Sequence, residues 1–279
     1  MISVSGKNWE EEKYNERLIS KIKIEKNLSE FIARQAVSKN FNKDEFYLID
    51  NNLELKNPFI NQEDFLEGVR LLDFSINNNE HILIIGDYDV DGCTSTSLIV
   101  ELLKKIKTKY SYYIPNRFTD GYGSTIKLMK KLIKKKPGLI IILDNGSNAN
   151  EAINYINEKK IKSLIIDHHE IYNPYPKSSV LINPKKKCNY SNFNYLCSAT
   201  LTYFFIDLYI KKKKLNINFS LNLPIVLMAI ISDVMPLRKI NRIIAKNVLL
   251  NFNLKKNFFF KRVFELKKIN KPIEINDFG

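Results

Sequence analysis

The sequence is poor in cysteine and histidine, and it has no long hydrophobic run. Its three cysteines, Cys93, Cys188 and Cys197, are scattered and odd in number, a pattern that predicts a reducing, cytoplasmic environment rather than a disulfide framework. Their spacing does not match a zinc site. No apolar segment is long enough to span a membrane, and the N-terminus lacks a signal-peptide pattern. These absences argue against a disulfide-rich secreted protein and against a membrane partner.

The composition is that of a globular and strongly basic protein. Its 279 residues suffice for one large or two modest domains, and 44% apolar residues suffice for a hydrophobic core. Lysine and arginine number 44 against 30 acidic residues, which gives a formal net charge of +14. Such a charge attracts polyanions, and nucleic acid is the first candidate partner. Runs of lysine and asparagine recur along the whole chain, so a general drift in composition explains the charge equally well.

Three short apolar runs each end in acidic or imidazole side chains. The run 82–85 continues into Gly86 and three alternating aspartates, the run 139–143 into Asp-Asn-Gly, and the run 163–166 into Asp-His-His. Continuous apolar runs of this length predict strands of a parallel sheet that is covered on both faces. The polar side chains that follow them are Asp87, Asp89, Asp91, Asp144, Asp167, His168 and His169.

Helical patterns alternate with these runs, which predicts an α/β fold: a doubly wound, mainly parallel sheet with helices on both faces. Open sheets of this kind bind ligands at the carboxyl ends of their strands. A single aspartate after a strand is commonly a helix N-cap. Carboxylates gathered from several strand ends, however, repel one another unless a cation neutralises them. Oxygen donors favour magnesium, manganese or calcium at this edge of the sheet.

The order of these motifs resembles the DHH phosphoesterase superfamily, and its RecJ branch in particular. The resemblance rests first on DYDVDG at 87–92, DNG at 144–146 and DHH at 167–169. It continues with IPNRF at 114–118, DGYG at 120–123, LCSA at 196–199, and SDVMPL at 232–237 followed by Asn241 and Arg242. These segments lie within about residues 45–250, and their combination is specific where a lone DHH triplet would not be.

The resemblance implies a centre of two Mn²⁺ or Mg²⁺ ions. Asp144 is expected to bridge the two ions, while Asp91, His168 and Asp233 complete one of the two sites. Two metal ions about 3.5–4 Å apart activate water, neutralise a phosphodiester and stabilise the leaving oxygen. The implied activity is therefore hydrolysis of phosphodiester bonds.

The second ion site and the acid/base chemistry involve further residues of the same motifs. Asp89 is expected to bind the second ion, helped by Asp87, because many relatives have a histidine at the position of Ile85. His169 is better suited to acid/base catalysis or phosphate contact than to metal binding, since adjacent strand residues point to opposite faces. Asp167 can orient an imidazole.

Substrate contacts are expected from the loop at 114–123 and from the helix after DYDVDG. Arg117 offers a planar donor fork suited to phosphate, and Asn116 precedes it. Gly121 and Gly123 permit a tight turn whose backbone amides can face the same phosphate. Ser95 can contact phosphate, although helix capping explains its presence equally well.

The RecJ resemblance implies a single-stranded-DNA exonuclease that degrades from 5′ to 3′ in DNA repair and recombination. Residues 1–70 are expected to form a helical extension, 71–250 the DHH domain, and 251–279 the start of a linker to an absent second lobe. A second chain that supplies this lobe is one expected partner. Two alternatives remain: a phosphoesterase for short oligonucleotides or small nucleotides, and a catalytically weak, truncated relic or DNA-binding subunit.

Overall fold

The computed structural model describes residues 5, 6, 8, 13–49, 53–121, 123–267 and 274–278. The chain forms two compact units, Met1–Glu54 and Leu55–Gly279. In the first unit, helices α1 (Glu16–Glu25) and α2 (Glu30–Ser38) pack together, and the 3-10 helix η1 (Lys43–Ile49) follows. An ion pair of 2.9 Å between Arg34 and Glu16 joins the two α-helices. The second unit contains all the acidic and histidine motifs of the sequence.

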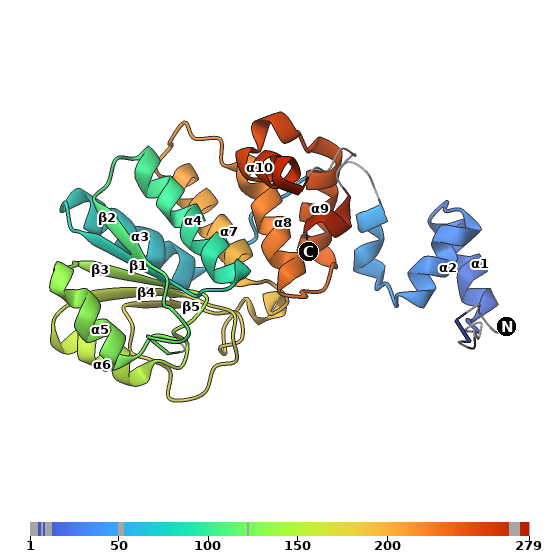
Figure 1. Cartoon of the computed structure of the whole chain (residues 1–279). Helices are drawn as coiled ribbons and strands as arrows, with labels where there is room; N and C mark the ends of the chain where they lie inside the picture. The colour runs from blue at the N-terminus through green and yellow to red at the C-terminus, as the bar shows by residue number, and fades with distance from the viewer. Residues whose placement is uncertain are drawn as a thin grey trace. The chain divides into compact units, whose positions relative to one another are not determined.

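A five-stranded parallel sheet forms the centre of the second unit (Figure 1). Its strands are β1 (Ile82–Gly86), β2 (Tyr110–Tyr113), β3 (Leu139–Leu143), β4 (Lys162–Ile166) and β5 (Val180–Ile182). Their order is β2-β1-β3-β4-β5, and every neighbouring pair is parallel. The predicted α/β fold is confirmed. Strand β5 is an addition, because it was not among the apolar runs from which the sheet was predicted.

Helices cover both faces of the sheet, and each face has its own core. On one face, Ile82, Ile84 and Ile141 pack in a large cluster with α3 (Glu63–Asn77), α4 (Val90–Lys105) and α7 (Ser198–Lys212). On the other face, Leu83, Ile85 and Ile142 pack with α5 (Ile126–Leu132) and α6 (Asn150–Glu158). Figure 1 shows these two helical layers above and below the sheet. The alternation of buried side chains explains why the strands are apolar throughout.

The C-terminal part of the second unit is helical. It contains α8 (Leu223–Ser232), α9 (Lys239–Asn251) and α10 (Phe258–Lys267). The second unit also has five short 3-10 helices: η2 (Ile133–Lys135), η3 (Ser191–Phe193), η4 (Ser220–Asn222), η5 (Leu254–Lys256) and η6 (Ile275–Phe278). The unit begins at Leu55 and includes α3; the domain boundary at residue 71 stays a prediction. Parts of the expected linker, 268–273 and 279, lie outside the described residues. Among the described helices, none combines the length and apolarity needed to cross a membrane.

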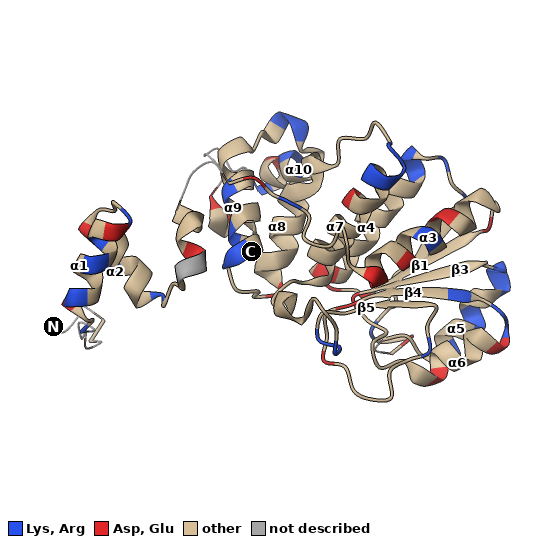
Figure 2. Ribbon diagram, turned by 180° about the vertical axis from the view of Figure 1, so that it is seen from behind, with Lys and Arg blue, Asp and Glu red and all other residues tan. Residues whose placement is uncertain are grey.

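The strand order fixes where a ligand can bind. The chain crosses from β1 to β2 on one side and then returns to β3 on the other side of β1. Successive crossovers therefore leave β1 in opposite directions, which opens a crevice beyond the carboxyl ends of β1 and β3. Asp87 and Asp144 are the first residues after these two strands. Figure 2 shows acidic segments gathered at this edge, whereas basic segments are spread over helix ends and loops.

Several helices end in a left-handed residue that is not glycine. The residue two positions after α1, α2 and α3 is an asparagine with φ near +50°, namely Asn27, Asn40 and Asn79. Lys107, Lys160 and Lys214 hold the same position after α4, α6 and α7. In each case the next N–H donates to a carbonyl five residues earlier, as in Thr108 to Leu103 at 2.9 Å. This hydrogen bond is the one that defines a Schellman helix end.

Candidate metal centre

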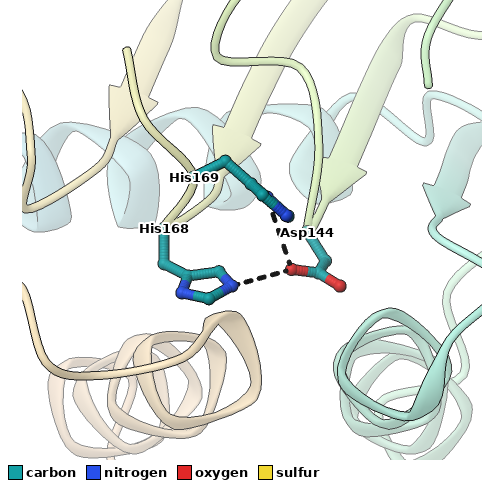
Figure 3. Close-up of side chains that lie close together, drawn as sticks. All are labelled: Asp144, His168 and His169. Atoms are coloured by element: carbon teal, nitrogen blue, oxygen red, sulfur yellow. Dashed lines mark ion pairs between the residues drawn. The ribbon is translucent and has the colours of Figure 1, made fainter. Parts of the chain in front are cut away.

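Four side chains from four separate segments converge at the carboxyl edge of the sheet. The Nε2 atom of His168, after β4, lies 3.4 Å from Asp144 Oδ1, after β3. The same nitrogen lies 3.4 Å from Asp233 Oδ2 at the end of α8, and 3.7 Å from Asp91 Oδ2 in the first turn of α4. Figure 3 shows His168 and His169 on the same side of Asp144. One imidazole nitrogen thus faces three carboxylates.

The turn between β1 and α4 positions the acids of the first motif. Asp89 is the N-cap of α4, and its Oδ1 accepts the N–H of Gly92 at 2.9 Å. A Cβ atom on Gly92 would lie 2.6–2.7 Å from backbone atoms of Asp87, so only glycine allows the helix to start this close to the strand. Asp89 is thus a helix N-cap that uses one of its two carboxylate oxygens, and its role as a metal ligand stays a prediction.

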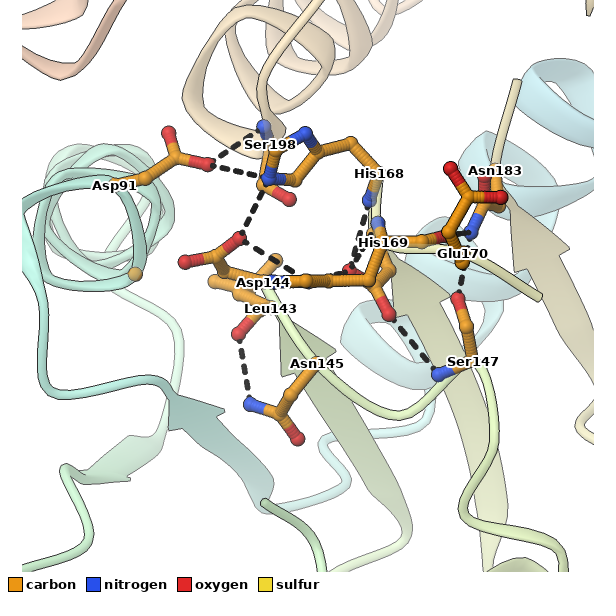
Figure 4. A network of polar contacts seen from close by, with 12 residues as sticks. Asp91, Leu143, Asp144, Asn145, Ser147, His168, His169, Glu170, Asn183 and Ser198 are labelled. Atoms are coloured by element: carbon orange, nitrogen blue, oxygen red, sulfur yellow. Dashed lines mark hydrogen bonds and ion pairs between the residues drawn. The ribbon is translucent and has the colours of Figure 1, made fainter. Parts of the chain in front are cut away.

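Asp91 also caps a helix, but a distant one. Its Oδ2 accepts the N–H of Ser198 at 2.8 Å, and its Oδ1 accepts the N–H of Ala199 at 2.9 Å. These are the first two residues of α7 (Figure 4). The N-terminal end of a helix dipole favours a negative charge. Helix α7 therefore fixes the carboxylate of Asp91 towards the cluster.

Asp144 is the most constrained acid of the cluster. It is buried and has a left-handed backbone, with φ of +61°, although its N–H still donates to the Ile166 carbonyl at 3.0 Å. Neither of its carboxylate oxygens has a hydrogen-bond donor among the described residues. Burial, and then the charges of Asp91 and Asp89, raise the pKa of this carboxyl far above its ordinary range. A buried carboxylate without donors is costly unless a cation binds it.

The donor set fits a divalent cation. The ligand atoms of Asp91, His168 and Asp233 lie within 4.8 Å of one another, and so do those of Asp144, His168 and His169. Both ring nitrogens of His168 also lack a hydrogen-bond partner among the described residues. Carboxylate oxygens with one imidazole suit manganese and magnesium better than a thiolate-preferring metal. A bound ion would therefore provide the partner that the carboxylate oxygens of Asp144 and a ring nitrogen of His168 lack.

His169 is held by Asp167 rather than by the cluster. Its Nδ1 lies 2.8 Å from Asp167 Oδ1 and 3.9 Å from Asp144 Oδ1. The hydrogen bond to Asp167 raises the pKa of His169 in spite of partial burial. Burial would raise the pKa of Asp167, but the hydrogen bonds from His169 and Ser147 outweigh it and lower that pKa to about 2. His169 is partly exposed, so its second ring nitrogen is left for a ligand.

A polar network next to His169 escaped the sequence-based prediction (Figure 4). The side-chain amide of Asn183 donates to Ser147 Oγ at 2.7 Å and to the His169 carbonyl at 2.9 Å. The N–H of Ser147 in turn donates to Asp167 at 3.0 Å. Asn183 directly follows β5. Its position after an apolar run was the available signal, since Asp144 and Asp167 of the site follow strands in the same way.

Asp87, Asp89 and Ile85, in and just before the first motif, are not part of the cluster around His168. Asp87 is buried, and its Oδ1 accepts the N–H of Tyr88 at 2.6 Å. Asp89 is exposed, and neither acid belongs to a three-residue ligand group among the described residues. Their charges still act on the centre, because Asp89 raises the pKa of both Asp87 and Asp144. Ile85 faces the α5/α6 core and contributes no ligand.

The expected substrate residues fall into two groups. Asn116 and Arg117 are exposed in the loop after β2; Asn116 Oδ1 accepts the N–H of Phe118 at 2.9 Å, and the Arg117 guanidinium lies 5.7 Å from the ring centre of Tyr88. Gly121 and Gly123 have φ of +82° and +73°, as a tight turn requires; Tyr122 between them lies outside the described residues.

Ser95, a predicted substrate contact, lies inside the fold. Its side chain is completely buried in α4, and its hydroxyl has no hydrogen-bond partner among the described residues. By the helical period it lies on the same face of α4 as Asp91, four residues earlier. Its contact with phosphate stays a prediction.

Comparisons with known proteins agree with this architecture. Residues 81–230 match the model of the DHH family, N-terminal domain. Since this match covers more than half of the 279 residues, the chain belongs to the DHH family. It is similar to the single-stranded-DNA-specific exonuclease RecJ of Haemophilus influenzae, with 31% identity over 188 residues, and to RecJ of Bacillus subtilis, with 27% identity over 190 residues.

The aligned part is only a fraction of these relatives. It covers 64% of this chain but 33% of the Haemophilus protein, and 67% of this chain but 24% of the Bacillus protein. Among solved structures, RecJ of Thermus thermophilus in complex with Mn²⁺ superposes on 94% of this chain and 37% of its own, with a TM-score of 0.74 and 16% identity. The likeness to that structure establishes the fold. The chain thus spans about a third or less of the curated relatives that it matches.

Proposed function

We propose that this protein is a metal-dependent phosphodiesterase that removes nucleotides from single-stranded DNA. The observation that carries the proposal is the convergence of Asp91, Asp144 and Asp233 on the Nε2 atom of His168. The relatives are single-stranded-DNA-specific exonucleases, and two RecJ structures contain Mn²⁺ or Mg²⁺. These names support Mn²⁺ or Mg²⁺ as the cofactor, with two ions in the centre.

The ligands have distinct tasks in this proposal. Asp91, His168 and Asp233 would hold one ion and Asp89 with Asp87 the other, and Asp144 would serve both. When bound, the two ions neutralise the phosphodiester and activate the attacking water. The cap contact from α7 orients Asp91 before any ion arrives, and burial keeps Asp144 free of competing solvent.

His169 is the proposed general acid. The Asp167 carboxylate accepts from its Nδ1 and raises its pKa, so the imidazole keeps its proton to a higher pH than a histidine without this partner. The other ring nitrogen can then give a proton to the leaving oxygen of the nucleotide. Asp167 is a positioning residue, because it acts only through His169 and the loop that it anchors.

Substrate binding is assigned to the exposed loop after β2 and to the charge of the protein. Arg117 and Asn116, with the backbone amides at Gly121 and Gly123, contact a phosphate of the strand. The net charge of +14 attracts the strand over longer distances. Degradation from the 5′ end, and a role in DNA repair and recombination, follow from the similarity to RecJ and are part of the proposal.

Manganese-dependent hydrolysis by the purified chain tests the proposal. The substrates are a long 5′-phosphorylated single strand, the matching duplex and a dinucleotide. Asp144→Asn removes the central ligand without changing its shape, and Asp73→Asn is a matched control. Asp73 forms an ion pair of 2.8 Å with Lys213 at the other end of the fold. We expect stepwise loss of nucleotides from the 5′ end, abolished in Asp144→Asn and retained in Asp73→Asn.

Other outcomes separate the alternatives. Cleavage of the dinucleotide alone would replace the exonuclease proposal by a phosphoesterase for small substrates. If the wild-type chain is folded and binds metal but hydrolyses no faster than Asp144→Asn, the chain is not a catalyst by itself, and a DNA-binding subunit is favoured. Loss from the 3′ end would contradict the polarity but not the phosphodiesterase.

A further inference from the structure

An apolar groove adjoins the acidic centre on the side of α4. It has a volume of about 780 Å³, and its lining includes Tyr88 and Asp89 at one end. Its walls are formed by Val90 and Cys93 of α4, Leu221 and Ile225 near the start of α8, and Phe258 and Phe259 of α10. We call these six residues the apolar groove. Figure 1 shows α10 beside α8, where the last of these walls lies.

The aromatic wall of the groove is unusually exposed. Phe258 is 83% exposed and Phe259 48%, and Leu221 on the opposite wall is 50% exposed. The helix that carries the two phenylalanines is itself anchored by Phe260, which is buried. The ring centroid of Phe260 lies 5.5 Å from that of Phe252 and 5.0 Å from that of Phe278. A set of exposed apolar side chains on a fixed helix is a recurrent sign of a binding surface.

The position of the groove relative to the acids indicates its ligand. Asp89 also lines the groove, and Asp91, two residues further along the same turn, lies 3.7 Å from His168 Nε2 in the candidate metal cluster. A phosphodiester bound at the cluster therefore has its flanking sugar and base at the entrance to the groove. The volume lies in the range of small-ligand pockets. Exposed aromatic rings bind bases by stacking, without regard to sequence.

We propose that the apolar groove binds the nucleobase next to the scissile phosphate, and that Phe258 and Phe259 provide its stacking surface. The proposal rests on the proposed phosphodiesterase function, since the cluster fixes where the phosphate lies. It makes the substrate a nucleotide strand with bases, rather than any phosphodiester. Lys256 at the rim adds a positive charge for the backbone of the same strand.

Protection of Cys93 from alkylation tests the groove without measuring activity. Cys93 lines the groove and is exposed, whereas Cys197 is buried and Cys188 is half-buried. The probes are a thymidine hexanucleotide and an abasic hexamer, both with phosphorothioate links that resist hydrolysis, in the presence of Mn²⁺. We expect the thymidine hexanucleotide, at about ten times its dissociation constant, to slow maleimide labelling of Cys93 by roughly tenfold, because only the unoccupied groove reacts, and the abasic hexamer at the same concentration to have little effect.

Variants on the same helix provide the second readout. Phe258→Ala is expected to weaken binding of the thymidine hexanucleotide roughly tenfold, because one stacking contact is lost, and to leave binding of the abasic hexamer unchanged. Leu266→Ala is the matched control: Leu266 is 65% exposed on α10 but outside the groove. Calorimetry with Mn²⁺ alone confirms that each variant retains its metal centre.

Three results would overturn the proposal. Equal protection of Cys93 by the two hexamers would mean that the groove does not distinguish bases. Equal effects of Phe258→Ala and Leu266→Ala would remove the role of the aromatic wall. Protection that increases with protein concentration, without any oligonucleotide, would assign the groove to a second copy of the chain. Failure of the phosphodiesterase itself would be recognised separately, as absence of hydrolysis of the unmodified hexanucleotide.

Discussion

The carboxylate of Asp91 accepts the backbone N–H of Ser198 at 2.8 Å, across 107 residues of sequence. The Asp91 side chain thus joins α4 to the start of α7 and also faces the Nε2 atom of His168. The metal centre is therefore coupled to the packing of the two helices. This coupling distinguishes Asp91 from Asp233, which also faces His168 but ends its own helix.

Removal of these two acids should separate stability from metal binding. Asp91→Ala is expected to lower the free energy of unfolding of the metal-free protein by about 1–2 kcal/mol, the usual cost of a lost helix cap. Asp233→Ala removes a carboxylate from a crowded cluster and should cost nothing measurable. Both variants should lose Mn²⁺ affinity. Urea unfolding and calorimetry measure the two quantities, and equal destabilisation by both variants would contradict the capping role.

Metal affinity should rise with pH. Burial and the neighbouring acids raise the pKa of Asp144 in the metal-free chain, and a carboxyl must lose its proton to bind an ion. Mn²⁺ should therefore bind more tightly at pH 8 than at pH 6 and release protons. Calorimetry in two buffers with different ionisation enthalpies detects this release. Identical binding heats in both buffers, at equal affinity, would exclude it.

The same raised pKa sets the sign of the stability change in the metal-free protein. The folded chain holds the proton of Asp144 more tightly than the unfolded chain, whose carboxyl titrates near about pH 4. The stability associated with this group is complete below about pH 4 and is lost as the pH rises towards the folded pKa. Added Mn²⁺ should restore stability at high pH, which thermal unfolding with and without the metal will measure.

Asp167→Asn should change the titration of His169. Since the hydrogen bond to Asp167 raises the pKa of His169, the substitution should move that pKa back down. The variant should also lose activity at the alkaline side sooner than the wild type, because less of the imidazole is protonated. Imidazole signals in NMR report the pKa directly. His169→Gln removes the imidazole, so its spectrum identifies which NMR signal belongs to His169. An unchanged pKa of His169 in Asp167→Asn would disprove the orienting role of Asp167.

Gly92→Ala should disrupt the first motif. Its Cβ would lie 2.6–2.7 Å from backbone atoms of Asp87, and the backbone cannot move aside without displacing Asp89. We expect a loss of about 3 kcal/mol of stability, at the upper end for overpacking, and weaker Mn²⁺ binding. Gly121→Ala is the comparison, because it has a left-handed φ of +82° but open space around it. It should cost about 1 kcal/mol and leave metal binding intact.

Those parts of the site that depend on strand ends could be predicted from the sequence. An apolar run followed by an acid places that acid at one edge of a parallel sheet, and this rule brought Asp144 and His168 to the same place. The rule could not show the cap from Asp91 to Ser198, because a contact over 107 residues leaves no local pattern. It also could not show that Ser95 is buried, since the packing of α4 decides that orientation.

Short elements were the other limit of the sequence-based prediction. Strand β5 has three residues, Val180–Ile182, too few for a period to emerge. It was therefore missed, and so was Asn183 at its end, with its hydrogen bonds to Ser147 and His169. The alternation of helices with strands was predicted, because the apolar faces of the main helices run over several turns.

The left-handed helix ends have a consequence for how this sequence tolerates its lysine-rich and asparagine-rich composition. Asparagine adopts that backbone with little strain, but lysine does so at a cost of about 1 kcal/mol at each position. The protein can thus be stabilised at three positions, Lys107, Lys160 and Lys214. Replacing all three by glycine would change neither the core nor the candidate metal centre, and it should raise the free energy of unfolding. All three lysines follow the C-terminal ends of their helices, whereas Asp91, one of the acids that face His168, lies in the first turn of α4.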